Sequence, residues 1–293
     1  MKVFKCNWLI SLVASVGLSC SIATPGWPQA LLPYTPTLNS EKLKEQGEAL
    51  FQDTIQLAQF QQFQLAFPVA KLVTQLIPLD YRPWFILGTI SVQQEELEEG
   101  IVALRRALKL APKEGQAGIL FTLGEAYFSL GDYTAAVEEL AAGLELEPNA
   151  PEALFNLGNS YFRLKEHQLA IANYQEAYSQ SKKEFWPAIN NVGLVKYEQG
   201  DVAGAIADWQ ATLTIAPEAA EPQLAIAVAL YTRGEKDRGL ALGSHALAID
   251  SSYGELEFLK KNLWGDRLLR DTEIFLRTPE IQAVLGSIQK HTP

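Results

Sequence analysis

The chain has 293 residues, of which 48% are hydrophobic and 20% charged, a composition typical of a folded protein and not of a disordered one. Its formal net charge is −10, and its basic residues cluster only in pairs, which excludes a surface built to neutralise nucleic-acid phosphates. The only cysteines are Cys6 and Cys20, so the body of the chain has no disulfide framework, cysteine zinc site or cysteine nucleophile.

Residues 1–23 are predicted to be a signal peptide or an N-terminal anchor. Lys2 and Lys5 precede a mostly apolar stretch, and Ser21 and Ala23 are the small residues that a cleavage site requires. The residues before Cys20 resemble a bacterial lipobox, although the glycine and leucine three and two positions before it depart from that pattern. Three fates therefore stay open: cleavage and export, lipid attachment at Cys20, and retention as an anchor, for which the apolar stretch is short.

Residues 24–40 are predicted to be a linker. They contain four prolines, and proline fixes the backbone angle φ and removes a hydrogen-bond donor. We expect an extended tether between the N-terminus and the folded body.

A pattern of about 34 residues repeats along residues 41–253. Each unit has a large apolar residue, then a glycine four residues later, and a small residue twelve positions after that glycine. The intervals between the glycines are 36, 34 and 35 residues, and four units in register are far more than a chance match. The glycines are Gly88, Gly124, Gly158 and Gly193.

Each unit is predicted to be a pair of helices. Apolar residues recur at helical spacing in both halves of a unit, and a glycine followed by an acid marks the turn between the halves. Proline ends three of the second helices, at Pro112, Pro148 and Pro217. A glycine inside a helix costs about 1 kcal/mol relative to alanine. We expect close approach to a small residue of the second helix to compensate at Ala136, Ala170 and Ala205.

The four units resemble the tetratricopeptide repeat family. Two degenerate units flank them, at residues 47–80 and 220–253, in which Thr54 and Ala227 replace the glycine. Terminal repeats are commonly atypical because one side meets solvent. The resemblance implies an all-α, right-handed superhelical solenoid of about six helix-turn-helix repeats.

Residues 254–293 do not match the repeat and are predicted to be a C-terminal helical cap. Helical patterns cover Leu256–Leu263, Asp266–Leu276 and Pro279–Ile288. The stretch Leu259–Pro279 is loosely similar to tails of cyanobacterial and plastid tetratricopeptide proteins.

The resemblance places a partner-binding groove along the first helix of each repeat. Two aromatic rows would line it, and such exposed apolar patches usually mark partner sites. The alternative is that these rings pack on neighbouring repeats or lie under the tail. The rows and the polar residues beside them are Phe85, Phe121 and Phe155; Phe128, Phe162 and Tyr197; and Asn159, Arg163, Asn190 and Asn191.

The clamp with which some family members hold a terminal carboxylate is incomplete. Asn159 and Asn191 match its two asparagine positions, but Phe155 and Glu221 stand where lysines are expected. An aromatic groove with few cations favours a hydrophobic or mixed segment of a protein partner of unknown identity.

No arrangement of residues suggests catalysis, a metal or a cofactor. The acidic pairs Glu95-Glu96 and Glu138-Glu139 lie at polar helix positions and are expected to be solvated, and His167 is expected to be exposed. The three histidines lie far apart, and neither a Gly-x-Ser-x-Gly nucleophile motif nor a phosphate-binding loop occurs. We expect no enzyme activity.

The sequence therefore predicts a protein-interaction scaffold that is exported to a periplasm or thylakoid lumen or tethered to a membrane. The tail resemblance implies a bacterial, cyanobacterial source and a role in assembling a photosynthetic membrane complex. The alternative is a self-associating structural component of the envelope.

Overall fold

The computed structural model describes residues 39–289, and they fold as one unit from Ser40 onward. The predicted signal segment, the possible lipidation site Cys20, nearly all of the linker and His291 lie outside these residues. The first helix begins at Ser40, seven residues before the first repeat expected from the sequence.

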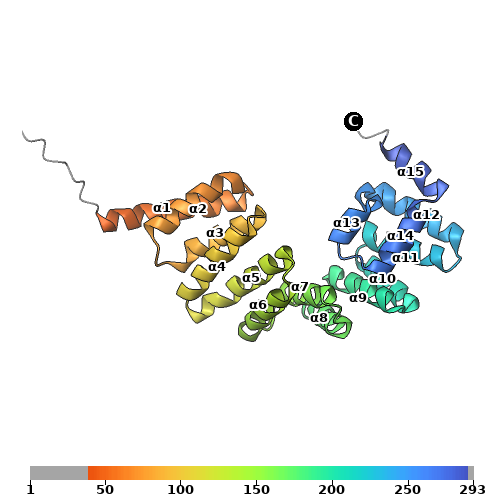
Figure 1. The fold of residues 1–293 in the computed structure, drawn as a ribbon, viewed down its shortest axis with the longest axis horizontal. Helices are drawn as coiled ribbons and strands as arrows, with labels where there is room; N and C mark the ends of the chain where they lie inside the picture. Colours follow the sequence, from red (N-terminus) through yellow and green to blue (C-terminus); the bar gives the residue numbers. More distant parts are fainter. Residues whose placement is uncertain (1–38, 290–293) are drawn as a thin grey trace, which may run out of the picture. The chain divides into compact units, whose positions relative to one another are not determined.

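Six helical hairpins follow one another and three further helices end the described chain (Figure 1). The first helices of the hairpins are α1 (Ser40–Gln59), α3 (Tyr81–Gln93), α5 (Gln116–Leu130), α7 (Pro151–Arg163), α9 (Trp186–Gln199) and α11 (Ala220–Thr232). The second helices are α2 (Phe63–Leu76), α4 (Leu97–Leu110), α6 (Tyr133–Leu146), α8 (His167–Gln180), α10 (Val202–Ile215) and α12 (Lys236–Ile249). Short 3₁₀ turns, η1 (Lys113–Gly115) and η2 (Ser251–Gly254), precede α5 and the tail.

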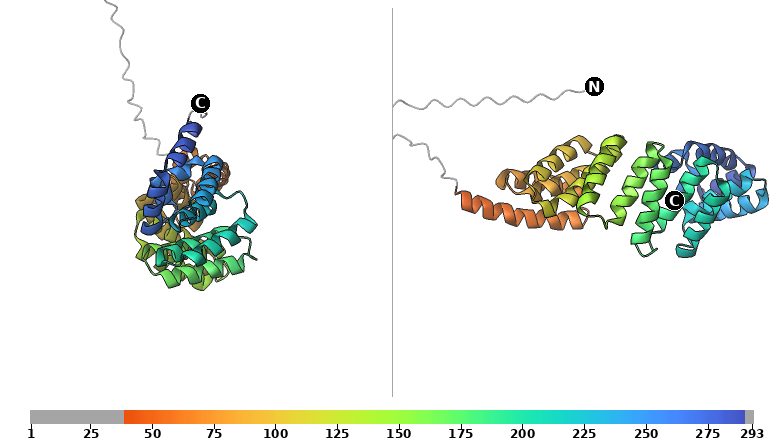
Figure 2. Two further views of the ribbon diagram at one scale, coloured as in Figure 1. Left: turned by 90° about the vertical axis from the view of Figure 1, so that its right-hand side faces the viewer. Right: turned by 90° about the horizontal axis from the view of Figure 1, so that it is seen from below.

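The tail consists of α13 (Leu256–Lys261), α14 (Asp266–Leu276) and α15 (Pro279–Gln289), close to the predicted ranges. No strand occurs among residues 39–289, and the predicted all-α solenoid is confirmed. Each hairpin packs against the next, and the right-hand view of Figure 2 shows the green helices lying side by side.

The turn inside each hairpin has the same backbone geometry in all six repeats. Gly131, Gly200 and Gly234 adopt φ of 86°, 89° and 94°, the left-handed conformation that ends a helix and that glycine adopts without strain. Gln61, Glu95 and Lys165 take the same conformation in the other three hairpins, with φ of 56°, 62° and 63°. After two of the glycine turns an aspartate caps the second helix: Asp132 accepts from Ala135 N and Asp201 from Gly204 N.

The signature glycines make room for a large side chain of the second helix, a neighbour that the sequence pattern did not name. The two helices also approach closely at Gly88, where an added Cβ atom would lie 3.1 Å from the backbone oxygen of Gly100. A Cβ atom added to Gly193 would lie 2.4 Å from Nε1 of Trp209, and one added to Gly158 would lie 2.7 Å from the ring of Tyr174. Leu104 and Leu140 fill the same position opposite Gly88 and Gly124. The partner always lies sixteen residues after the glycine, and all four of these side chains are fully buried.

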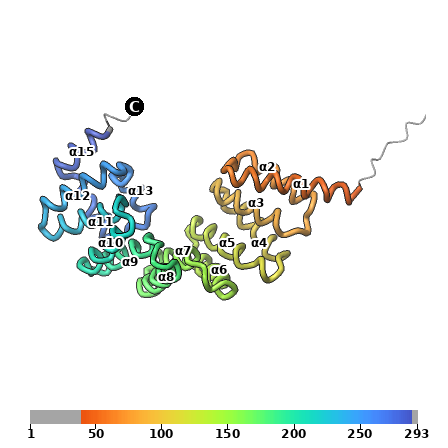
Figure 3. The backbone as a smooth tube through the Cα atoms, turned by 180° about the vertical axis from the view of Figure 1, so that it is seen from behind, coloured from red at the N-terminus to blue at the C-terminus, as the bar shows by residue number. Residues whose placement is uncertain are grey.

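The tail completes the sixth repeat. In this repeat Ala227 replaces the signature glycine, and a glycine, Gly243, replaces the large side chain sixteen residues later. Phe275 of α14 fills the space, since a Cβ atom on Gly243 would lie 2.4 Å from its Cζ atom. Phe275 is fully buried, and Figure 3 shows the blue tail folded back onto α11.

Two residues that we expected in solvent are covered. Glu139 is only 8% exposed, and it pairs with Arg105 of the preceding second helix at 2.6 Å. His167 is half-buried at the start of α8, with its ring centroid 5.9 Å from that of Phe162. In both cases the side chain lies toward a packing neighbour that the helical period alone did not reveal.

Candidate functional site

The predicted groove residues lie on one side of the first helices, which we call the first-helix face. It carries the positions six and three residues before, and one, four and five residues after, the signature glycine or its substitute. The rings of Phe85, Phe121 and Phe155 are half-buried there. Phe121 occupies the space beside Gly143 of α6, and the Phe155 ring meets that of Phe185 edge to face with 5.1 Å between centroids. These rings are therefore held by neighbouring helices and expose only part of their surface.

The second aromatic row becomes more buried along the chain. Phe128 is half-buried and packs 5.3 Å from Tyr133, whereas Phe162 is 9% exposed and Tyr197 fully buried. The last two lie where the tail packs on the first-helix face. In this part of the row the tail therefore packs beside the rings.

The asparagines of the incomplete clamp are bonded to each other and to neighbours. Asn159 Oδ1 accepts hydrogen bonds from Tyr174 OH at 2.8 Å and from Asn191 Nδ2 at 3.1 Å. The backbone oxygen of Asn190 accepts from Trp209 Nε1 at 3.1 Å. Burial raises the pKa of the Tyr174 phenol. All three asparagines are buried, so this network supports the packing of repeats four and five.

The tail is held on the first-helix face by hydrogen bonds at the start of α14. Glu198 of α9 accepts from the backbone N–H groups of Arg267 at 3.0 Å and Leu268 at 2.9 Å. A carboxylate at this position is favourable, because the first N–H groups of a helix have no partner within it and carry partial positive charge. Tyr197 OH donates to Asp271 at 2.6 Å one turn further along.

Two more contacts fix the loop between α13 and α14. Arg163 of α7 donates to the backbone oxygen of Lys260 at 3.0 Å, and Trp264 Nε1 donates to Glu221 Oε1 at 2.8 Å. Burial raises the pKa of the Glu221 carboxyl to about 7. Leu263, which is buried, has φ of 66°, an uncommon conformation for a leucine.

Sequence reasoning placed Arg163 and Tyr197 in a groove, and the structure turns both toward the tail. It missed the roles of Glu198, Glu221 and Trp264. The sequence did contain a signal for this contact: Glu198 and Glu221 are acids at groove positions of consecutive repeats. A carboxylate at such a position can bind the N-terminus of a helix in the tail.

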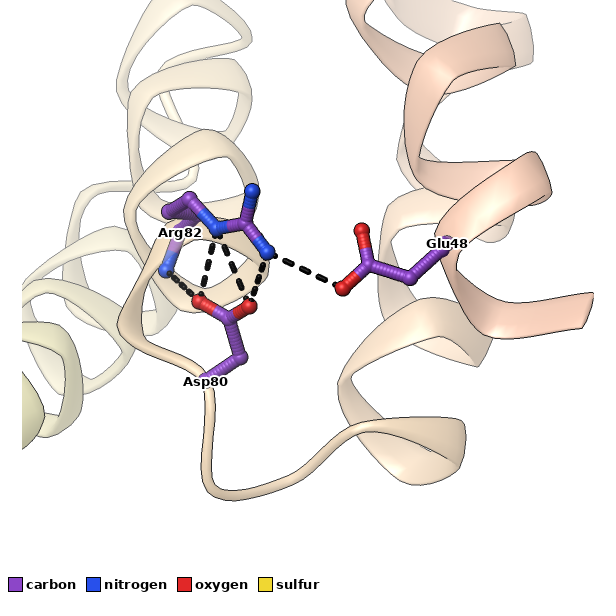
Figure 4. A network of polar contacts seen from close by, with 3 residues as sticks. All are labelled: Glu48, Asp80 and Arg82. Atoms are coloured by element: carbon purple, nitrogen blue, oxygen red, sulfur yellow. Dashed lines mark hydrogen bonds and ion pairs between the residues drawn. The ribbon is translucent and has the colours of Figure 1, made fainter. Parts of the chain in front are cut away.

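At the other end of the stack, a pocket of about 680 Å³ lies beside the loop between α2 and α3. Figure 4 shows Arg82 bonded to both Asp80 and Glu48. Arg82 Nη2 lies 3.0 Å from Glu48 Oε1. The Arg82 guanidinium lowers the pKa of the Asp80 carboxyl. Lys44 and Leu79, whose side chain is 78% exposed, also line this pocket.

Between these ends, the first-helix face of α3, α5 and the first part of α7, before Phe162, is not covered by the tail. Glu125 as a whole residue is exposed there, and its carboxylate accepts from Asn156 Nδ2 at 2.9 Å. Neighbouring atoms partly remove water from the carboxyl group, and this desolvation raises its pKa. Glu152 is exposed on α7. No ion pair to either carboxylate occurs within the described part of the chain.

Family models for the tetratricopeptide repeat match residues 81–114, 121–185 and 193–253, which together make up more than half of the chain. The chain belongs to the tetratricopeptide repeat family. Members of this family generally act as scaffolds that bind other proteins. The matched ranges cover hairpins two to six, and the first hairpin, α1 and α2, lies outside them.

Curated tetratricopeptide relatives are similar over parts of their length. The mouse Superkiller complex protein 3 is 28% identical over 120 residues, 41% of this chain and 8% of that protein. The BBSome complex member BBS4 of Xenopus tropicalis is 28% identical over 141 residues, 48% of this chain and 27% of that protein. The chain thus spans less than a third of the relatives it matches.

Solved structures share the fold. A crystal structure of MamA is 25% identical with a TM-score of 0.51, over 57% of this chain and 96% of that one. The structure of the Cut9–Hcn1 complex has a TM-score of 0.60 at 17% identity, and the match covers 85% of this chain and 44% of that one. YrrB is described as a tetratricopeptide protein with an unusual peptide-binding site. Its structure has a TM-score of 0.52 at 16% identity, and the match covers 67% of this chain and 100% of that one.

Within residues 39–289, no three histidine, cysteine, aspartate or glutamate side chains gather as a metal site would require. His245 lies alone, with Nδ1 2.7 Å from Gln223 Oε1. None of the helices in this range has the length and apolar character needed to cross a membrane.

Proposed function

We propose that this chain is a non-enzymatic scaffold that binds a partner protein on the uncovered first-helix face of α3, α5 and the first part of α7. The observation that carries the proposal is the contrast along this face. Over α9 and α11 it holds helix α14 of the chain's own tail. Over α3, α5 and the first part of α7 it presents half-buried rings and carboxylates that form no ion pair in the described residues. A surface with this composition favours a partner because it has apolar area left to bury.

Two exposed positions test this assignment without disturbing the core. Gln93 of α3 and Ser129 of α5 both lie five residues after a signature glycine. The double variant Gln93→Arg/Ser129→Arg should lose partner proteins that the full chain captures from extracts of its own cells. Its matched control is Thr134→Arg/Gln175→Arg, at exposed positions of second helices α6 and α8. Equal recovery of the same partners by both variants would argue against binding on this face.

We further propose that the protein acts outside the cytoplasm, in a periplasm or thylakoid lumen or tethered to a membrane, where it helps assemble a membrane complex such as a photosynthetic one. The apolar N-terminal segment and the proline-rich linker support this. Mass spectrometry of the mature protein would distinguish the three fates. Cleavage after Ala23, lipid on Cys20 and an intact N-terminus each give a different mass, whereas cytoplasmic protein with its N-terminus intact would contradict export.

The second candidate is a structural component that associates with itself. It is favoured by Phe60 and Leu65, which are 68% and 60% exposed beside the turn between α1 and α2. If these side chains join copies, sedimentation equilibrium should show oligomers that Phe60→Ser/Leu65→Ser converts to monomers. A monomer at all concentrations would exclude this candidate.

A further inference from the structure

An open notch lies on the first-helix face between repeats two and three. Gly118 stands six residues before the signature Gly124, at a position that other repeats fill with Glu48, Arg82 and Glu152. Gly118 is exposed, and a Cβ atom built on it would approach only the Cζ atom of Phe85, at 3.9 Å. The missing side chain therefore leaves the edge of the Phe85 ring accessible beside α5.

This notch differs from the other close approaches of glycine in the stack. Gly88, Gly124, Gly158 and Gly193 are filled by a large side chain of their own hairpin, so those glycines are explained by packing. Nothing in the described chain occupies the space at Gly118. A glycine inside a helix lowers its stability, and here no packing contact offsets the loss.

On the first-helix face beside the notch, the charged side chains that form no ion pair are acidic. Helix α5 carries no lysine or arginine, and its single ionisable acid on this face is Glu125, two turns after Gly118. Glu152 lies at the equivalent of Gly118 on the next first helix. The nearest first-helix cations, Arg82 and Arg163, are bonded to Asp80 and Glu48 and to the tail. The face between them is therefore acidic and has no cation of its own.

Resting on the proposed function, we infer that the partner presents a segment with one apolar side chain for the notch at Gly118 and Phe85 and a lysine or arginine for Glu125. Seven residues of helix separate Gly118 from Glu125, about 10 Å at 1.5 Å per residue. An extended segment covers this distance in about three residues. The expected motif is an apolar residue followed, or preceded, by a cation three positions away.

Labelled twelve-residue peptides test this inference by fluorescence anisotropy on the full-length protein. The first set carries Phe or Leu with Lys or Arg three positions away in a Gly/Ser background. The second set replaces the cation with Glu, and the third replaces the apolar residue with Ser. The first set should bind at least tenfold more tightly than either of the others, and its affinity should fall with added salt.

Two variants identify the site. Gly118→Gln fills the notch while improving helix propensity, so it should weaken the first peptide set at least tenfold with a Tm no lower than that of the wild type. Glu125→Gln should remove the preference for a cation and keep the apolar preference. Gly286→Gln is the matched control, at another helical glycine whose added Cβ atom would meet nothing within 4 Å, and it should change neither binding nor preference.

Equal binding of the basic and acidic peptides, or unchanged affinity of Gly118→Gln, would overturn this inference. The proposed scaffold function has a separate outcome. If the wild type captures cellular partners and Gln93→Arg/Ser129→Arg loses them while these peptides show no preference, then the face is the partner site and the assigned chemistry is wrong. If neither Gln93→Arg/Ser129→Arg nor the variants at Gly118 and Glu125 change partner capture, then partners bind elsewhere and the proposed site on this face is wrong.

Discussion

Each central repeat contains a size-matched pair of residues, a glycine on the first helix and a large side chain sixteen residues later. The pairs end in leucine, leucine, tyrosine and tryptophan at Leu104, Leu140, Tyr174 and Trp209. Because the interior is close-packed, a methyl group added at the glycine has no space to enter. The periodic glycine could be predicted from the sequence, but its partner could not, since a helical period places a side chain on a face without naming its neighbour.

Substitution at Gly193 tests this pairing. Gly193→Ala gains helix propensity of about 1 kcal/mol but forces Cβ against Trp209, and overpacking of this kind costs about 1–3 kcal/mol. We expect net destabilisation, measured as a lower urea midpoint. In a Trp209→Ala background, the same substitution should be neutral or stabilising. An unchanged penalty in that background would show that the tryptophan is not the obstacle.

The Glu221 carboxyl gives the stability a dependence on pH. Burial raises its pKa from 4.5 to about 7, so in this range the folded state binds the proton more tightly than the unfolded state. The contribution of this group to stability is therefore full below about pH 4.5 and is lost as the pH rises through 7. Glu221→Gln keeps an oxygen for Trp264 and does not titrate. Its stability relative to the wild type should rise between pH 5 and pH 8 in urea titrations, and a difference independent of pH would contradict the assignment.

At the scale of elements, the tail is an integral part of the stack. Leu259, Trp264, Leu268 and Ile281 are each at most 1% exposed, and α14 lies on the first helices α9 and α11. The N-terminus of α14 has no cap of its own, because Gly265 offers no side chain. Glu198 supplies the acceptor from another repeat.

Two variants should loosen α14. Glu198→Gln removes the charge at the helix N-terminus, and Gly265→Ala would place Cβ 2.3 Å from the Glu198 carboxyl carbon, so both should disturb the same contact. Loss of a cap typically costs about 1 kcal/mol. We expect faster amide hydrogen exchange in residues 266–276 than in the wild type. The control is Gln199→Ala, at the exposed neighbouring position, which should leave exchange in α14 unchanged.

The three tail helices could be predicted from their periodicity and from Pro279, but their docking could not. Docking depends on Glu198 and Glu221, which lie 68 and 45 residues before Asp266, the first residue of α14. Nothing in the sequence near Asp266 indicates which distant residues it will meet. Likewise the turns at Gln61, Glu95 and Lys165 carry no glycine, so only structure shows that all six hairpins reverse in the same way. The groove asparagines matched a family position, yet their burial depends on Tyr174, which the same pattern assigned to the core.

At the scale of the molecule, the stack has two different ends. In a repeat array each unit contacts mainly its neighbours, so stability is close to a sum of local terms. The C-terminal end is covered by the tail, whereas the N-terminal end presents α1, in which only Gly47, Phe51 and Thr54 are buried. Opening should therefore begin at the N-terminal hairpin.

Removal of residues 254–293 tests this view. It would expose Tyr197, Leu224 and the space beside Gly243, so repeats five and six should lose hydrogen-exchange protection while α3 to α6 keep it. Removal of α1 and α2 should leave repeats five and six protected. A uniform loss of protection after tail deletion would indicate a single cooperative unit instead of a graded array.

The Phe275 contact at Gly243 also sets where the chain can grow. A duplicated hairpin placed between α6 and α7 would present the same surfaces to both neighbours and would lengthen the uncovered face. One placed after α12 would separate Phe275 from Gly243, and the tail could pack on it only if the added hairpin carried a glycine at the same position. Gene duplication can therefore extend this protein from the middle without altering the tail contact, and natural variants of different length should keep a glycine at this position in whichever hairpin precedes the tail.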